Sequence, residues 1–493
     1  MPTLVGMPAT ITPPAPSSLP STLGALRASG YRSRDVRTEL RDNLLARMRE
    51  GTPRFDGVVG FDDTVLPEVE RALLAGHDMV LLGERGQGKT RLLRSLVQLL
   101  DEWSPHVAGS ELFEDPLAPV LPVTRARAET EGEDLAVAWR HRSERYNEKL
   151  ATPDTSIGDL IGDVDPVRVA EGRSLGDPET IHFGLLPRTN RGIFAVNELP
   201  DLAERIQVGL LNVLEERDLQ VRGYALRLPL DVLLVASANP EDYTNRGRII
   251  TPLKDRFGAE VRTHYPVDLQ AEVELVTQEA AVGRGGVARV PSHLVEVLAR
   301  WTRAVRESPS VDSRSGVSAR FAVAATETVA AAADRRAALL GEDGPAVARV
   351  TDLESGVGTL RGKVEFESGE EGREYEVLAH LLRVATAETY RDRLGGADLS
   401  GFLDRVAEGG HVDVGDDVRV GDLLASVGTV EGLGAVCTRL GLEDAPLPGE
   451  VAAVVEFVLE GLHLTRRLAK DPVEPGRTRF SARQRPRAVD EGR

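Results

Sequence analysis

The sequence predicts an α/β fold with a central parallel sheet, followed by a mostly helical region. Three apolar segments, at 78–82, 192–197 and 232–236, predict buried strands of such a sheet. The first two are followed by residues at helical spacing, as expected when parallel strands are connected by helices. Beyond residue 266 the strand pattern gives way to helical stretches.

The segment Gly83–Thr90 fits the phosphate-binding loop pattern G-x-x-x-x-G-K-[ST]. In such a loop, backbone N–H groups surround phosphate oxygens, the lysine contacts the β- and γ-phosphates, and the threonine hydroxyl binds Mg²⁺. A chance match in a chain of this composition is expected about 0.005 times. The alternative is a glycine turn that holds no ligand. The predicted ligands are therefore ATP and Mg²⁺, and the candidate binding residues are Gly83, Glu84, Arg85, Gly86, Gln87, Gly88, Lys89 and Thr90.

The second apolar segment ends in a polar pair, Asn197 and Glu198. ATP hydrolysis needs a second strand that brings polar groups to the metal and to the attacking water. The first residue of such a pair is usually Asp, whereas Asn197 can accept a hydrogen bond from a metal-bound water but adds no charge. We expect Asn197 at the metal, Glu198 as the base, and slow hydrolysis. The alternative is a plain buried strand followed by a turn at Pro200.

Two further polar residues are candidates for the hydrolytic site. Asn239 follows the strand at 232–236 and can orient the water near the γ-phosphate, although an Asn-Pro pair also fits a turn. Arg256 can stabilise charge that develops on the nucleotide of a neighbouring subunit. The alternative for Arg256 is a surface ion pair.

Composition excludes several classes of protein. A net charge of −18 and a pI near 5.1 argue against a general nucleic-acid binder, which needs a basic face, and leave a local basic patch open. The single cysteine, Cys437, excludes an intramolecular disulfide, and the nine histidines lack ligand spacing. The chain has neither an apolar stretch of about 18 residues nor a signal-peptide pattern, so we expect a cytoplasmic protein without membrane insertion.

Changes in composition divide the chain into five segments. The first residues are rich in Pro, Ser and Thr, and the last are rich in Pro and Arg, which is typical of disorder. The predicted segments are a leader with a helical part at 1–54, an α/β core at 55–265 with an acidic insertion at 101–146, a helical segment at 266–345, a mostly helical region at 346–470 and a disordered tail at 471–493.

Together these motifs resemble the AAA+ ATPases, and among them the magnesium chelatase I subunit and MoxR-like group. The resemblance covers roughly residues 55–340 and implies a P-loop domain followed by a helical lid at 266–345. The segments 155–186 and 219–228 resemble two insertions of this group, one in the second helix and one a hairpin before the first sensor. By position, Val59 and Gly60 match the segment over adenine, Asn197 and Glu198 the second acidic motif, Asn239 the first sensor, Arg256 the arginine finger and Arg320 the second sensor. A surface salt bridge is the alternative for Arg320.

The resemblance implies an ATP-hydrolysing motor that forms a homo-oligomeric, hexameric ring. Such a motor remodels a protein partner or inserts a metal into it, and the implied partner carries a von Willebrand A domain. Two alternatives stay open. One is a nucleotide-dependent scaffold with little turnover, which Asn197 favours. The other is a true magnesium chelatase subunit of tetrapyrrole synthesis.

Overall fold

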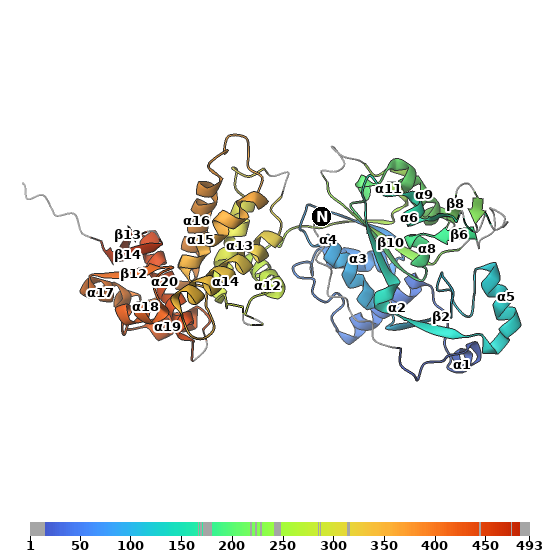
Figure 1. The fold of residues 1–493 in the computed structure, drawn as a ribbon, viewed down its shortest axis with the longest axis horizontal. Helices are drawn as coiled ribbons and strands as arrows, with labels where there is room; N and C mark the ends of the chain where they lie inside the picture. Colours follow the sequence, from blue (N-terminus) through green and yellow to red (C-terminus); the bar gives the residue numbers. More distant parts are fainter. Residues whose placement is uncertain are drawn as a thin grey trace, which may run out of the picture. The chain divides into compact units, whose positions relative to one another are not determined.

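The computed structural model describes residues 15–483 except 166, 168–169, 171–179, 217–218, 222–223, 227–228, 241–247, 284, 286, 313–315, 443–444 and 475. The chain divides into two compact units, Met1–His264 and Tyr265–Arg493 (Figure 1). Each unit has its own hydrophobic core and is described by itself.

The first unit is built on a five-stranded sheet with the order β11-β1-β10-β7-β4, in which all neighbouring strands are parallel. The three central strands consist wholly of buried residues, because helices cover both faces of the sheet. The strands are β1 (Met79–Leu82), β4 (Tyr146–Leu150), β7 (Gly192–Asn197), β10 (Val232–Ala238) and β11 (Ala259–Arg262).

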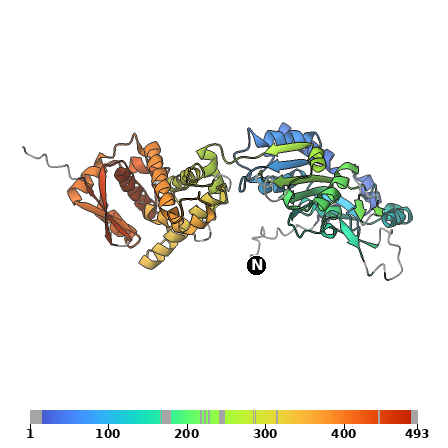
Figure 2. The ribbon, with the colours of Figure 1, turned by 90° about the horizontal axis from the view of Figure 1, so that it is seen from above.

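Alternate residues of the strands pack on opposite helical layers. Met79 and Leu81 join the core under one layer, and Val80 and Leu82 join the core under the other. One layer holds α2 (Val36–Glu50), α3 (Val65–Leu74) and α4 (Lys89–Ser95), and the other holds α6 (Ile157–Leu160), α8 (Leu185–Arg188), α9 (Glu204–Glu216) and α11 (Thr251–Arg256). The sheet lies between them in both views of this unit (Figures 1 and 2). The predicted α/β fold with a central parallel sheet is therefore confirmed.

The predicted boundary at residue 54 does not separate the N-terminal helix from the core. Leu40 and Leu44 of α2 are buried in the same core as β1, and Arg145 contacts Glu39 through two hydrogen bonds of 2.7 and 2.6 Å in the protein interior. Helix α2 belongs to the layer that covers the sheet, and the prediction of a separate segment was wrong here. Residues 1–14 lie outside the described residues, so the disordered leader stays a prediction.

The acidic insertion predicted at 101–146 contains an antiparallel hairpin and a helix. Strands β2 (Trp103–Val107) and β3 (Val137–His141) pair, and α5 (Pro122–Glu131) lies between them in the chain. The N-terminal helix α1 (Leu23–Ala28) packs on this hairpin, because Leu23 shares a small core with Val107 and Leu135.

Two further hairpins lie in the segments 155–186 and 219–228, which were predicted as insertions. Strands β5 (Gly162–Val164) and β6 (Ile181–Phe183) pair between α6 and α8, and residues 171–179 of this segment lie outside the described residues. Strands β8 (Leu219–Val221) and β9 (Tyr224–Leu226) pair as the predicted hairpin before β10.

The second unit is a helical domain with one three-stranded antiparallel sheet, ordered β12-β14-β13. One core runs from Ala288 to Phe480, and the buried pair Arg336–Asp352, at 3.0 Å, crosses the boundary that was predicted between lid and C-terminal region. That boundary is not a domain boundary in the described residues. The elements are α12 (Leu269–Glu279), α13 (Ser292–Arg306), α14 (Arg320–Leu340), α15 (Val350–Leu360), α16 (Glu374–Leu394), α17 (Ser400–Gly409), β12 (His411–Gly415), α18 (Val420–Val427), α19 (Leu433–Arg439), α20 (Pro448–Leu464), β13 (Leu468–Glu474) and β14 (Arg477–Ala482).

The prediction of a disordered tail from residue 471 was wrong for most of the residues that the structure describes there. Strands β13 and β14 form a hairpin, and Phe480 is buried in the core of the unit. Arg479 forms two hydrogen bonds with Asp413 on β12, of 2.7 and 2.9 Å. Arg479, one of the arginines that suggested disorder, is thus paired across a sheet.

Candidate nucleotide-binding site

The predicted phosphate loop connects β1 to α4 and has a conformation that requires its glycines. Gly86 and Gly88 have φ values of 76° and 75°, which residues with side chains rarely adopt. A Cβ atom on Gly83 would overlap the side-chain oxygens of Thr263 and Gln87. The backbone therefore turns tightly around the N-terminus of α4, as a loop that surrounds phosphate must.

Lys89 connects the loop to the end of β10. Its side chain is buried, and its ammonium group donates hydrogen bonds to the backbone oxygens of Gly83 and Glu84, the latter at 2.7 Å. It also donates to Asn239 Oδ1 at 2.8 Å. The structure thus brings together two residues that lie 150 positions apart and that the sequence predicted for the same site.

Thr90 and Asn197 also meet, at the ends of neighbouring elements. Thr90 Oγ1 lies 3.4 Å from Asn197 Oδ1, and Asn197 is buried at the end of β7. Ser237 Oγ of β10 lies 3.3 Å from the same Oδ1 atom. Hydroxyl and amide oxygens are suitable partners for Mg²⁺ and its bound waters, so the residues present fit the predicted metal.

Glu198 has a strained backbone. Its φ and ψ angles are 56° and 47°, in the left-handed region that residues other than glycine seldom occupy. Such a conformation costs about 1–3 kcal/mol and is found preferentially at functional sites. The N–H group of Glu198 donates to Ser237 Oγ at 3.3 Å, so a side chain of the adjacent strand holds this conformation.

The segment predicted to lie over adenine is close to the loop. Phe61, which follows Val59 and Gly60, comes within 3.8 Å of the position of a Cβ atom on Gly88. The Phe61 ring also makes an edge contact with His264, with the ring centres 5.2 Å apart. This proximity is consistent with the predicted role of Val59 and Gly60, which stays a prediction.

Thr263 and Ser237 contact the site although neither was predicted for it. Thr263, just after β11, donates to Gln87 Oε1 at 2.9 Å, and the same oxygen accepts from the Glu84 N–H at 3.0 Å. Thr263 follows a short polar strand without an apolar pattern, so no signal marked it. Ser237 did carry one, because it is a hydroxyl residue within an otherwise apolar strand, two positions before Asn239.

The two predicted arginines lie in different units. Arg256 is exposed in the last turn of α11, which leads into β11 beside β1. An exposed position is what action on a neighbouring subunit requires, although the role itself stays a prediction. Arg320 is the exposed first residue of α14 in the second unit, and its role as a second sensor also stays a prediction.

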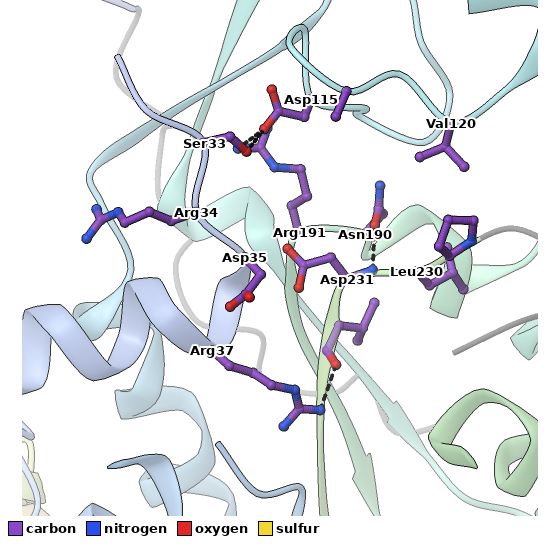
Figure 3. A pocket seen from close by; sticks show the side chains of 13 residues that line it. Ser33, Arg34, Asp35, Arg37, Asp115, Val120, Asn190, Arg191, Leu230 and Asp231 are labelled. Carbon is purple, nitrogen blue, oxygen red and sulfur yellow. Dashed lines mark hydrogen bonds and ion pairs between the residues drawn. The ribbon is translucent and has the colours of Figure 1, made fainter. Parts of the chain in front are cut away.

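The first unit has a separate cavity of 460 Å³ at the opposite ends of the strands (Figure 3). Arg191 and Asp231, which directly precede β7 and β10, line it. Both carboxylate oxygens of Asp231 accept from the Val36 N–H, at 3.1 and 2.9 Å. Burial raises the pKa of Asp231 to about 6, against the effect of that hydrogen bond. Arg191 and Asp231 are both hydrogen-bonded to other groups of the protein.

Other kinds of site find no support in the part of the chain that the structure describes. There, no group of His, Cys, Asp and Glu side chains is suited to hold a metal ion. Among the same residues, no helix is both long and apolar enough to cross a membrane. Cys437 is buried and unpaired with another cysteine.

Comparison with known proteins gives magnesium-chelatase subunits among the relatives of the chain. No protein-family model matches the chain. The magnesium-chelatase 38 kDa subunit of Cereibacter sphaeroides is 31% identical over 237 residues, which are 46% of this chain and 63% of that protein. The magnesium-chelatase subunit ChlI of Anabaena variabilis is 28% identical over 205 residues, which are 41% of this chain and 57% of that protein. The chain thus spans less than two thirds of the length of either relative.

Two solved structures illustrate the similarity of the chain to known structures. One is a complex between subunits BchI and BchD of magnesium chelatase, with 22% identity, a TM-score of 0.34, and coverage of 66% of this chain and 98% of that chain. The other is the Holliday junction branch migration motor RuvB of Thermotoga maritima, with 12% identity, a TM-score of 0.31 and coverage of 90% of each chain.

Proposed function

Because the chain is a relative of the AAA+ magnesium-chelatase I subunits, we propose that it binds ATP with Mg²⁺ and hydrolyses the ATP as a ring-forming motor. One observation carries the proposal. Lys89 of the loop lies within hydrogen-bonding distance of Asn239, which directly follows β10, and Thr90 lies within hydrogen-bonding distance of Asn197, which ends the adjacent strand β7. Ligands of α/β sheets bind at this carboxyl edge.

Each residue has a chemical part in the proposed reaction. Lys89 places a positive charge at the phosphates, and Thr90 and Asn197 offer oxygen atoms to the metal or its waters. Bound Mg²⁺ would neutralise phosphate charge. Glu198 orients the attacking water and accepts its proton. Asn239 accepts from Lys89 through Oδ1, so its amide nitrogen is the donor available for a phosphate oxygen or the water.

Arg256 completes the site in a neighbouring subunit, in this proposal, so activity depends on assembly. Lys89→Ala removes nucleotide binding and keeps Arg256. Arg256→Ala removes the arginine and keeps nucleotide binding. Each variant alone should lose at least about 100-fold in turnover, because each removes a charge that the transition state needs. A mixture of the two should regain activity. Arg262→Ala is the control, since Arg262 is an exposed arginine of the neighbouring strand β11 that pairs with Glu260.

Turnover per subunit should also rise with protein concentration as rings assemble. A wild-type rate per subunit that stays constant when the protein is diluted to monomers would contradict the ring mechanism. The same holds for mixtures of the two variants that stay inactive although both variants assemble.

Asn197 favours a second candidate function, a scaffold that binds ATP and turns it over little. The amide brings no negative charge to the metal, unlike the carboxylate usual at this position. The decisive comparison is steady-state hydrolysis by the wild type, Glu198→Gln and Asn197→Asp. Unchanged turnover in Glu198→Gln would support the scaffold, while a large loss supports the motor.

The similarity to magnesium-chelatase subunits also suggests what kind of client the motor acts on. We favour a von Willebrand A domain protein that the motor remodels or supplies with a metal. Glu198→Gln with ATP should retain such a client in a pull-down, because the nucleotide is bound but not hydrolysed. The tetrapyrrole alternative instead predicts magnesium insertion into a porphyrin when the chain replaces the I subunit of a reconstituted chelatase.

A further inference from the structure

Ser237 is a buried hydroxyl residue that bridges the two residues of the predicted acidic motif. It lies on β10, and its hydroxyl faces the end of the neighbouring strand β7. The Glu198 N–H donates to Ser237 Oγ at 3.3 Å, and Ser237 Oγ donates to Asn197 Oδ1 at 3.3 Å. One side chain thus contacts both the candidate base and the candidate metal-side amide.

The directions of these hydrogen bonds follow from their chemistry. A backbone N–H can only donate, so Ser237 Oγ accepts from Glu198 and directs its own proton to another acceptor. That acceptor is Asn197 Oδ1. Thr90 Oγ1 donates to the same oxygen from the opposite element, at 3.4 Å. With Oδ1 in this place both hydroxyl protons have an acceptor, so the two hydroxyl groups favour the oxygen end of the amide over its NH₂ end.

This selection matters because the residue is an amide. A carboxylate at this position would present two equivalent oxygens, and its rotation would change nothing. An amide that rotates by half a turn presents NH₂, which cannot accept a hydrogen bond from a metal-bound water. Resting on the proposed function, we propose that Ser237 is a positioning residue, whose hydroxyl fixes the Asn197 amide with Oδ1 toward Thr90.

The proposal makes the effect of Ser237 depend on the residue at position 197. Ser237→Ala should lower ATP turnover about 10-fold, the effect of one lost hydrogen bond in a buried site. In an Asn197→Asp background the same change should lower turnover less, because the orientation of a carboxylate does not matter and only the hydrogen bond from the Glu198 N–H is lost. Ser95→Ala is the matched control, since Ser95 is a buried serine of α4 whose hydroxyl donates to the Leu92 backbone oxygen, at 2.7 Å.

A binding measurement tests the same point without turnover. Titration of ADP with and without Mg²⁺ gives the ratio by which the metal tightens nucleotide binding. Ser237→Ala should lower this ratio about 5- to 10-fold and leave the affinity for metal-free ADP unchanged. In the Asn197→Asp background the ratio should stay within about 2-fold of that background alone. If Ser237→Ala loses metal-free ADP binding, and so its fold, Ser237→Cys replaces it, because a thiol keeps the volume but donates weakly.

Two results would overturn the proposal. One is a Mg²⁺ ratio in the folded variant equal to that of the wild type. The other is an equal loss from Ser237→Ala in the wild-type and Asn197→Asp backgrounds, which would assign Ser237 a general structural role. A wild type that binds Mg²⁺–ADP but never hydrolyses ATP would refute the proposed motor, and the Mg²⁺ ratio would still decide the role of Ser237.

Discussion

Replacement of Gly83 by alanine should disable the phosphate loop. The added methyl group would overlap Thr263 Oγ1 and Gln87 Oε1, so both side chains would have to rotate. That movement breaks the Thr263–Gln87 hydrogen bond of 2.9 Å and the Glu84–Gln87 hydrogen bond of 3.0 Å. Each broken hydrogen bond costs about 1 kcal/mol, and each buried group left unpaired costs about as much again. The native conformation of the loop is therefore destabilised by about 2–4 kcal/mol.

Nucleotide binding requires the native conformation of the loop, so this destabilisation weakens the binding of nucleotide. Because each 1.4 kcal/mol is about a tenfold change, a loss of about 2–4 kcal/mol lowers the affinity for ADP about 30- to 700-fold. Titration of a fluorescent ADP analogue measures this loss. The control is Gly158→Ala in the same unit, where a Cβ atom meets Ser156 and Asp163 at an ordinary 3.6 Å. If folded Gly83→Ala binds ADP with wild-type affinity, the contacts of Thr263 and Gln87 do not hold the loop in its binding conformation.

Three further predictions concern buried charges. Burial raises the folded-state pKa of Asp231 to about 6. The contribution of Asp231 to the unfolding free energy is therefore complete below pH 3.8 and falls by about 3 kcal/mol by pH 7. Asp231→Asn should remove this fall, as measured by denaturation at several pH values. Burial lowers the pKa of His293 to about 3. The unfolding free energy should therefore fall by about 2 kcal/mol as the pH is lowered from 6.5 to about 5. His293→Phe should abolish this fall in the same assay. Arg145→Met should lower the unfolding free energy by about 3–5 kcal/mol because Glu39 stays buried without its partner, and Arg145→Met with Glu39→Gln should recover part of it.

The sequence predicted the centre of the sheet and not its edges. The strands β1, β7 and β10 are covered on both faces and read as continuous apolar runs, which is why they were predicted. The edge strands β4 and β11 have the sequences YNEKL and AEVR, and most of their residues are partly exposed. Without an apolar period, only their pairing with a central strand defines them.

Domain boundaries were harder to predict for a related reason. Composition marks a change of character, whereas a domain is defined by which side chains share a core. Helix α2 was placed with a leader, before an α/β core that was predicted to begin at residue 55, yet its apolar side covers the sheet. The hairpin β13–β14 was placed in a disordered tail because of its arginines, yet Arg479 pairs with Asp413. Neither contact is local in sequence.

The resemblance to magnesium-chelatase I subunits, by contrast, could be drawn from short motifs and is confirmed by the curated relatives. The motif positions Lys89, Thr90, Asn197 and Asn239 do meet in space. A motif fixes such residues because phosphate and metal chemistry allow few alternatives at each place. The supporting contacts of Thr263 and Ser237 have no such constraint on spacing, so they came only from the structure.

Asn197 shows why a departure from a motif has to be judged together with its neighbours. Taken alone, the loss of a carboxylate predicts weaker metal binding and slow hydrolysis. In the structure, the amide oxygen accepts from hydroxyl groups on two different elements, α4 and β10, and the second of these also holds the strained Glu198 backbone. An amide that is oriented in this way keeps the hydrogen-bonding part of the carboxylate's role and loses only its charge. The cost to catalysis is then the difference in charge alone, which Asn197→Asp measures directly.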